Sequence, residues 1–202
     1  WQNTIDGFFL SHPDADHIGG AQKLINTFHV KNIFLSGVHH DSEIFNTFLS
    51  TLKKKNIHVV FLQNQQDIRY GNYIFDTIFP FQPLVGKNVS KGNNTSLVIR
   101  ILGGGSSFLL TGDIEKKIEK VILASPNRLH SDILKIPHHG SKSSSSEDFL
   151  LAVKPKDAII SASKNNPFSH PHQEVLHRLN SLLVPYKVTR YTGDIPIVFS
   201  LL

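Results

Sequence analysis

The densest group of metal-ligand residue types lies near the start of the chain, between Ser11 and Gly20. It contains two histidines and two aspartates directly after an apolar run: His12, Asp14, Asp16 and His17. On an extended loop, residues 12, 14 and 16 point to one side and residue 17 to the other, so the loop can supply ligands to two metal ions. A single His and Asp pair is usually a surface or capping feature. The density of this group instead predicts a metal site.

Asp113 is a second candidate ligand, because it follows the apolar run Phe108 to Thr111. Active-site residues of α/β proteins commonly lie just past the ends of strands. A simpler interpretation is that Asp113 only caps the helix expected from Ile114 onward. The sequence alone leaves both roles open.

The adjacent residues His138 and His139 form a third group, again after an apolar run. In such a pair one imidazole commonly orients the other or faces substrate, so we expect one metal ligand and leave open which it is. Ser141, Lys142 and Ser143 follow, with hydroxyls and a positive charge that suit a phosphate group. An ordinary solvated helix start is the alternative for these three residues.

Histidine is unusually frequent, with 12 in 202 residues, and His170 and His172 form a last group around a proline. We expect these two near substrate, although a role in stiffening the loop explains them equally well. The composition is otherwise globular, with 40% hydrophobic and 18% charged residues. The absence of cysteine excludes disulfides, thiolate metal sites and cysteine nucleophiles. The net charge of +5 permits a polyanionic partner.

The elements that must position these groups alternate between short β-rich runs and amphipathic helices. We predict strands over 6–10, 32–36, 57–62, 96–102, 107–111, 132–137, 158–163, 186–191 and 195–202, and a hairpin between 67 and 79. Helices are predicted over 21–28, from Asp41 to the lysines at 53–55, over 114–122, around Phe149 and over 173–180. No apolar run approaches the ~18 residues that span a bilayer. We therefore expect one α/β domain over residues 1–202, with mixed sheets covered by helices.

The order of the motifs resembles the metallo-β-lactamase superfamily: His-x-Asp-x-Asp-His-x-Gly-Gly, then strand-Thr-Gly-Asp, then strand-His-His-Gly. With the segments 93–98 and 170–172, the chain is similar in particular to the C-terminal metallo-β-lactamase-like domain of ComEC-type competence proteins. Those proteins are membrane channels that import DNA in natural transformation. The resemblance implies a four-layer αββα sandwich with metals at one edge between the sheets. It also implies that the first strands of the fold are missing here, because the chain begins inside the last strand before the His/Asp loop.

Carried over by motif, the resemblance assigns His12 and Asp14 to a first metal ion and Asp16 and His17 to a second. Asp113 would bridge the ions, and His138 or His139 would complete the second site. Our assignment from the motifs takes the metal ligands as His12, Asp14, Asp16, His17, Asp113 and His138. It takes Asp16 and His139 as catalytic residues. The residues expected to contact substrate are Asn94, Ser141, Lys142, Ser143, His170 and His172.

Two departures from the commonest superfamily pattern exchange nitrogen for oxygen: Asp14 replaces a histidine, and Asn94 lies where a third histidine ligand is usual. Oxygen-rich sites suit harder ions, so we expect two divalent ions, Mn²⁺ first, with Mg²⁺ or Zn²⁺ as alternatives. Two such ions suit phosphodiester hydrolysis. No organic cofactor is expected.

The resulting hypothesis is a metal-dependent nuclease that degrades the DNA strand not imported during uptake. Its partners would be single-stranded DNA and the transmembrane channel of the same parent protein, with this soluble domain outside the cytoplasm. One alternative is a non-catalytic module that docks DNA, for which Phe168 and Phe81 are candidate stacking residues. The other is a stand-alone metallo-hydrolase of small esters or lactams.

Overall fold

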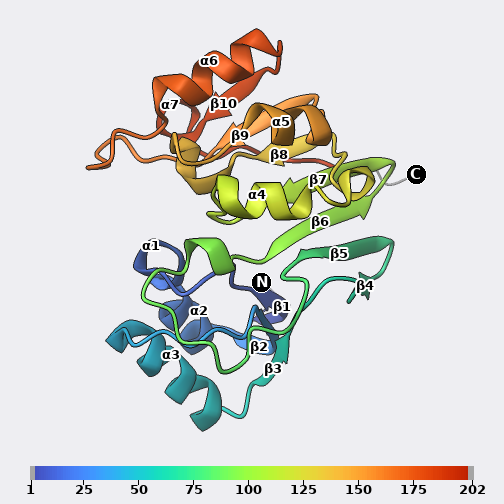
Figure 1. The fold of residues 1–202 in the computed structure, drawn as a ribbon. Coiled ribbons are helices and arrows are strands. Elements are labelled where there is room, and N and C mark those ends of the chain that lie inside the picture. Colours follow the sequence, from blue (N-terminus) through green and yellow to red (C-terminus); the bar gives the residue numbers. More distant parts are fainter. Residues whose placement is uncertain (1–2, 200–202) are drawn as a thin grey trace.

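The computed structural model describes residues 3–199, which form two β-sheets with helices on their outer faces (Figure 1). The N-terminal part of the chain builds a three-stranded sheet with its helices, and the rest builds a seven-stranded sheet with its own. The two parts stack with their sheets facing each other. No helix within residues 3–199 has both the length and the apolar character needed to cross a bilayer.

The smaller sheet has the order β1-β2-β3, with β1 at Thr4–Phe9, β2 at His29–Leu35 and β3 at His58–Phe61. All three strands run parallel, because helices make the crossovers between them. Helices α1 (Ala15–Ile18) and α2 (Ala21–Thr27) join β1 to β2. Helix α3 (Glu43–Lys54) joins β2 to β3 and buries the apolar stripe that the sequence predicts, with Phe45, Phe48 and Leu52 inside.

The larger sheet has the order β10-β9-β8-β7-β6-β5-β4 and is mixed. Its antiparallel part contains β4 (Ile68–Tyr70), β5 (Tyr73–Phe79), β6 (Val98–Gly103) and β7 (Ser106–Leu110). The hairpin predicted between 67 and 79 is confirmed by the antiparallel pair β4 and β5. Its parallel part continues through β8 (Ile133–Lys135), β9 (Asp157–Ile160) and β10 (Tyr186–Val188). The helices of this half are α4 (Lys116–Ile122), α5 (Glu147–Val153), α6 (Gln173–Ser181) and α7 (Thr189–Thr192).

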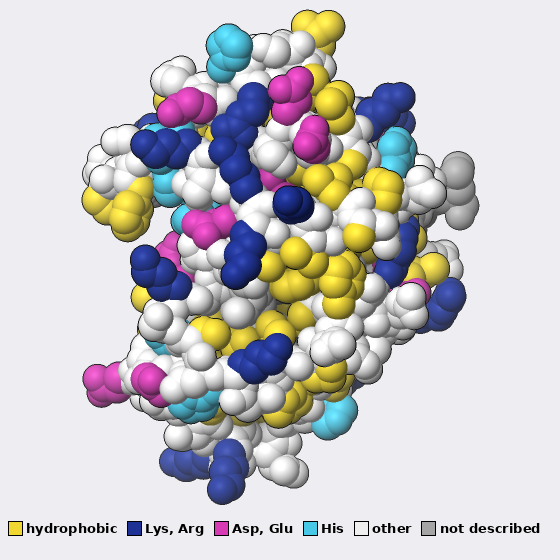
Figure 2. All heavy atoms as spheres, viewed as in Figure 1, with side chains coloured by type: hydrophobic (Ala, Val, Ile, Leu, Met, Phe, Trp, Pro, Cys, Tyr) yellow, Lys and Arg dark blue, Asp and Glu magenta, His cyan; other side chains and the backbone are white. Residues whose placement is uncertain are grey.

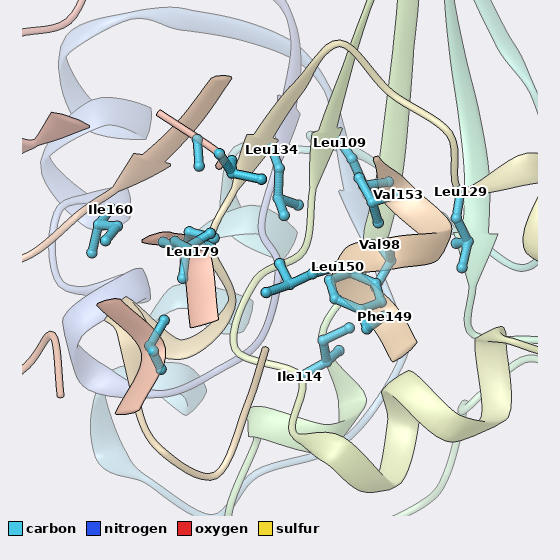
Figure 3. Close-up of a cluster of buried hydrophobic side chains, with 14 of the residues drawn as sticks. Val98, Leu109, Ile114, Leu129, Leu134, Phe149, Leu150, Val153, Ile160 and Leu179 are labelled. Atoms are coloured by element: carbon cyan, nitrogen blue, oxygen red, sulfur yellow. The ribbon is translucent and has the colours of Figure 1, made fainter. Parts of the chain in front are cut away.

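Three groups of buried apolar side chains hold the layers together. One lies between the large sheet and its helices, where Phe149 and Leu150 of α5 occupy the middle of the cluster (Figure 3). A second joins the small sheet to α1, α2 and α3. A third lies between the sheets, where Phe9 stacks on Phe34 at 4.4 Å and on Phe75 at 5.2 Å between ring centroids. These three interfaces separate four layers, so the predicted αββα class is confirmed.

Two details differ from the expectations. The smaller sheet is parallel among the described strands, where mixed directions were expected. The strand predicted over 186–191 ends at Val188, where the chain turns into α7, and residues 193–199 contain no strand. The remaining residues of the predicted last strand, 200–202, lie outside the described part of the chain.

Candidate metal centre

The candidate ligands come from loops at the ends of strands β1, β7 and β8. Asp113 follows β7, and the short 3₁₀ turn Pro137–Gly140 follows β8. The His/Asp loop follows β1, but the prediction that it is extended is wrong. Asp14 is the N-cap of α1, so Asp16 and His17 lie on one helical turn, whereas His12 precedes it. Helical spacing, rather than alternation along a strand, therefore sets the directions of Asp16 and His17.

Four of the predicted residues converge, and we call them the four-ligand cluster: Asp16, His17, Asp113 and His139. Each offers one ligand atom, and these atoms lie within 4.8 Å of one another. His139 Nε2 is 3.1 Å from Asp113 Oδ2 and 3.2 Å from Asp16 Oδ2. His17 Nε2 is 3.3 Å from Asp113 Oδ1. Two carboxylates and two imidazoles from three separate segments are a donor set that a divalent cation accepts.

His12 and Asp14, here called the His12 pair, lie beside this cluster. His12 Nε2 is 3.8 Å from Asp14 Oδ2. The ring is buried, and within residues 3–199 its Nε2 atom has no hydrogen-bond partner. Its Nδ1 atom lies 3.0 Å from Ser11 Oγ and 3.2 Å from Ser96 Oγ, which fix the ring. A buried polar atom without a partner lowers the stability of the fold by about 1–3 kcal/mol. The orphaned Nε2 atom therefore fits the role of a metal ligand.

The electrostatics of the four-ligand cluster show two carboxylates held by one protonated imidazole. Hydrogen bonds to Asp113 and Asp16 raise the pKa of His139 to about 9. The same contact with His139 lowers the pKa of Asp16 to about 2. Burial alone would raise the pKa of Asp113, but hydrogen bonds from His139 and His17 hold it far below its usual range. The proton on His139 therefore takes the place of a cation between the two carboxylates.

Comparison with known proteins identifies the family of the chain. The model of the metallo-beta-lactamase superfamily matches residues 2–164. The chain belongs to the metallo-beta-lactamase superfamily. ComE operon protein 3 of Bacillus subtilis is 34% identical over 191 residues, 95% of this chain and 24% of that protein. Competence protein ComA of Neisseria gonorrhoeae is 30% identical over 183 residues, 88% of this chain and 23% of that protein.

The chain spans about a quarter of the length of these curated relatives. Among solved structures, the metallo-beta-lactamase fold protein YhfI of Bacillus subtilis has a TM-score of 0.53 at 13% identity, covering 91% of this chain and 74% of that one. The resemblance inferred from the motifs, including the link to competence proteins, is confirmed. The superfamily implies divalent metal ions, and the four-ligand cluster is the candidate site.

The two adjacent histidines of this superfamily domain separate. His139 joins the cluster because its Nδ1–H donates to the carbonyl oxygen of Ser161 at 2.7 Å, which leaves Nε2 facing the carboxylates. His138 points elsewhere, with Nδ1 3.8 Å from Glu115 Oε1 and Nε2 3.4 Å from the amide nitrogen of Asn93. Both histidines have left-handed backbones, with φ of 48° and 54°. Such conformations cost energy, are held by surrounding structure and cluster at functional sites. The geometry therefore offers His139 as the ligand, in the place that the motif-based assignment gives to His138.

The predicted substrate residues lie around His138. The Asn94 side chain donates to Glu115 Oε2 at 2.7 Å and accepts from the Glu115 backbone N–H at 3.0 Å, so both ends of its amide are bonded to Glu115. Ser143 Oγ is 3.3 Å from His138 Nδ1 and 3.0 Å from Ser141 Oγ.

The remaining members of this group stack or bond to one another. The backbone N–H of Lys142 donates to His172 Nδ1 at 3.1 Å, and the Lys142 side chain is exposed. The His170 ring lies 5.5 Å from that of His138 and 4.8 Å from that of His172, measured between centroids. Burial and the nearby His138 lower the pKa of His170 to about 4, so this ring is neutral at physiological pH. Together these residues form a rim of hydroxyls and imidazoles beside the exposed side chain of Lys142.

Three residues that contact the candidate ligands were not singled out by the motif analysis. Lys135 extends from β8 and donates from Nζ to the Gly112 carbonyl at 2.7 Å and to Asp113 Oδ1 at 3.3 Å. Burial lowers its pKa, and the ion pair with Asp113 opposes that shift. Ser11 Oγ lies within 3.1 Å of His17 Nδ1 as well as near His12, and Ser96 Oγ accepts from the Asp113 N–H. A charged residue inside the apolar run at 132–137, and a serine next to His12, were the available signals.

Proposed function

We propose that this superfamily domain is a metal-dependent nuclease that hydrolyses phosphodiester bonds of single-stranded DNA. The observation that carries the proposal is the four-ligand cluster beside the orphaned, buried His12 Nε2. Asp16, His17, Asp113 and His139 would hold one divalent ion, and the His12 pair would contribute to a second. When bound, two such ions supply a deprotonated water at neutral pH and charge stabilisation for the phosphate.

The chain's own residues divide the remaining work. Asp113 is buried and held by Lys135, so it provides a fixed negative charge at the centre of the site. Asp16 is largely exposed and its low pKa keeps it ionised, so its carboxylate can bind an ion and orient a water. In this proposal it also receives the proton of that water, as the motif-based assignment expects. His139, fixed by Ser161, serves as a ligand rather than as a free acid in this proposal. His138, on the substrate rim, takes the role of facing the scissile group.

The mixed oxygen and nitrogen donors support a hard or borderline ion, and we propose Mn²⁺, with Mg²⁺ or Zn²⁺ as alternatives. Asp16, Asp113 and Asp14 supply three carboxylates against three imidazoles. A set richer in imidazole, as in zinc enzymes with three histidines, would favour Zn²⁺ more strongly.

Exposed lysines support a path for a phosphate backbone next to the rim. Lys116, Lys117 and Lys120 on α4 are exposed, and the Lys116 N–H donates to the Ser143 carbonyl at 2.9 Å, which connects α4 to the Ser/Lys loop. Figure 2 shows Lys and Arg side chains gathered over and above α4 on this face. Such charges bind phosphates without reading the base sequence.

The relatives point to a place for this activity. Because the chain covers about a quarter of proteins named for competence, we propose that it belongs to a membrane protein that imports DNA. In that setting the domain would face the side from which DNA arrives, outside the cytoplasm. It would degrade the strand that is not imported, and its partner would be the transmembrane channel of the same protein.

The decisive experiment is cleavage of end-labelled single-stranded DNA by this chain with Mn²⁺, Mg²⁺, Zn²⁺ or EDTA. We expect cleavage with Mn²⁺ that EDTA abolishes. Asp16→Ala should reduce the rate at least ~100-fold, because it removes a ligand and a proton acceptor. Asp67→Ala, at an exposed aspartate outside the site, is the matched control and should cleave normally.

Other outcomes select the alternatives. DNA binding without cleavage in any metal would favour a docking module that retains the look of an enzyme. Cleavage of esters or lactams with Zn²⁺, without any cleavage of DNA, would favour a hydrolase of small substrates. Undiminished cleavage by Asp16→Ala would disprove the assigned site.

A further inference from the structure

We propose that Phe168, backed by His170, forms a nucleobase-stacking subsite that holds a base of single-stranded nucleic acid next to the four-ligand cluster. This inference rests on the proposed function for the identity of the polymer. It adds a residue and a ligand chemistry that metal binding leaves unassigned. Phe168 is the starting point because its ring is 69% exposed although it lies against the site.

Three rings form a nearly parallel series that leads from solvent to the cluster. Phe168 stacks on His170 with centroids 5.7 Å apart and an angle of 24° between planes. His170 stacks on His139 with centroids 6.3 Å apart and an angle of 15°. The inner end of the series is therefore a member of the four-ligand cluster. The outer aromatic face of Phe168 is left free to accept one more flat ring.

A cavity of about 340 Å³ joins Phe168 to the cluster. Its lining includes Asp16 and His139 as well as Phe168 and His170. Small-molecule sites begin at about 300 Å³, so this space suits one nucleotide rather than a long ligand. With a cation held by Asp16 and His139, a phosphate bound to that cation would place the attached sugar and base along this cavity, toward Phe168.

The loop that carries Phe168 is braced from within. Asn166 accepts from the His170 N–H at 2.7 Å, and its amide donates to the carbonyls of His170 at 2.9 Å and Ser163 at 3.0 Å. Arg190 of α7 also donates to the His170 carbonyl. In Figure 1 this orange segment between β9 and α6 extends outward on the same side of the view as α1. A braced loop presents its ring with little ordering cost on binding.

The lining of the cavity combines apolar and polar groups. The apolar side chains of Ala162, Pro167 and Phe168 lie beside the polar side chains of Ser161, Ser163 and Asn165. A nucleobase has the matching form, with π faces and a polar edge, and stacking on an aromatic side chain tolerates every base.

The first test measures binding in EDTA, where cleavage is absent, to a single-stranded oligonucleotide and to an abasic strand of the same length. Phe168→Ala should bind the base-bearing strand roughly 5- to 100-fold more weakly and the abasic strand as before. Phe168→Tyr should restore binding. Leu183→Ala, at a residue 88% exposed outside the cavity, is the matched control and should leave both affinities unchanged. Equal losses for both strands, or no loss, would overturn the subsite.

A second test separates the subsite from the nuclease proposal. Phe168→Trp, titrated in EDTA with thymidine 5′-monophosphate, should lose fluorescence as the base stacks, whereas 2-deoxyribose 5-phosphate should leave it unchanged. The parent chain, with its single Trp1, gives the background. Quenching without DNA cleavage would refute the nuclease and keep the subsite. Cleavage without specific quenching would refute the subsite and keep the nuclease.

Discussion

At the four-ligand cluster, loops after three different strands bring two carboxylates and two imidazoles within 4.8 Å of one another. At the His12 pair, two residues from one loop face each other at 3.8 Å, and Asn94, at the usual position of a third ligand, is bonded to Glu115 instead. The first arrangement offers a complete donor set from the protein. The second offers half of one, with a buried nitrogen that has no partner among residues 3–199.

This difference indicates unequal ion affinities. The cluster should bind its ion tightly, and the His12 pair should bind a second ion more weakly. Oxygen atoms of the substrate would supply the remaining ligands of that second ion. Lys135 moderates the affinity of the cluster, because its ammonium group lies 3.3 Å from Asp113 Oδ1 and neutralises part of that carboxylate's charge.

The largest effect is expected at the two adjacent histidines, which serve as a matched pair of variants. His139→Gln should lower the affinity for the more tightly bound metal ion roughly 1,000-fold. Loss of a residue that only orients a ligand typically costs 10- to 100-fold in affinity, and loss of a direct ligand costs more. His138→Gln should change the affinity for this ion less than about threefold. Titration against a chelating dye measures both. If the two variants exchange these results, the ligand assignment is reversed.

The second test is the pH dependence of metal binding. At pH 7 the His139 ring, with a pKa of about 9, carries a proton that a metal ion must displace. Affinity at the cluster should therefore rise about tenfold per pH unit between 7 and 9, near 100-fold in all, and then level off. His12 differs because burial and the neighbouring His17 ring lower its pKa to about 3, so no proton competes there.

Calorimetry in buffers of different ionisation enthalpy measures the protons released on binding. We expect close to one proton for the first equivalent at pH 7 and none from His12 for the second. If the affinity for the first metal ion did not change with pH, the protonated state of His139 would be contradicted.

A smaller effect should follow from Ser96→Ala. Removing this hydroxyl frees one side of the His12 ring and leaves the Asp113 N–H without its acceptor. We expect the second metal equivalent to weaken about tenfold and the first to change little. Ser107→Ala, a buried serine that bonds Asp132 elsewhere on the large sheet, controls for general destabilisation. Equal weakening of both equivalents would mean that the two sides of the centre are not independent.

The smallest effect concerns the rim on the His138 side. Lys142→Ala should reduce the salt dependence of single-stranded DNA binding by about 0.7 unit of slope, the value for one lost phosphate contact. Lys53→Ala, at an exposed lysine of α3 in the other half of the molecule, should leave the slope unchanged. Binding measured at several salt concentrations gives the slope. An unaltered slope for Lys142→Ala would remove this loop from the DNA path.

Much of the centre was readable before any coordinates. Asp113, His139 and the loop at 12–17 each follow an apolar run, and strand ends in α/β proteins converge on one edge. Periodicity likewise predicted α3 with its buried Phe45 and Phe48, because amphipathic spacing is a local property. The failures came from tertiary contacts. Residues 186–191 have strand composition, yet the Thr189 hydroxyl, bonded to the Ala162 N–H and carbonyl, accompanies the change from strand to α7.

The amino-acid order alone was enough to name the ligand types, the elements that carry them and the superfamily they resemble. Only the tertiary structure distinguished His139 from His138, because left-handed backbone angles and the distant Ser161 carbonyl set their directions. The same holds for Lys135 against Asp113, and for the stacking of Phe168, His170 and His139. These contacts join residues far apart in the chain, and neither spacing nor propensity carries information about which distant groups will meet.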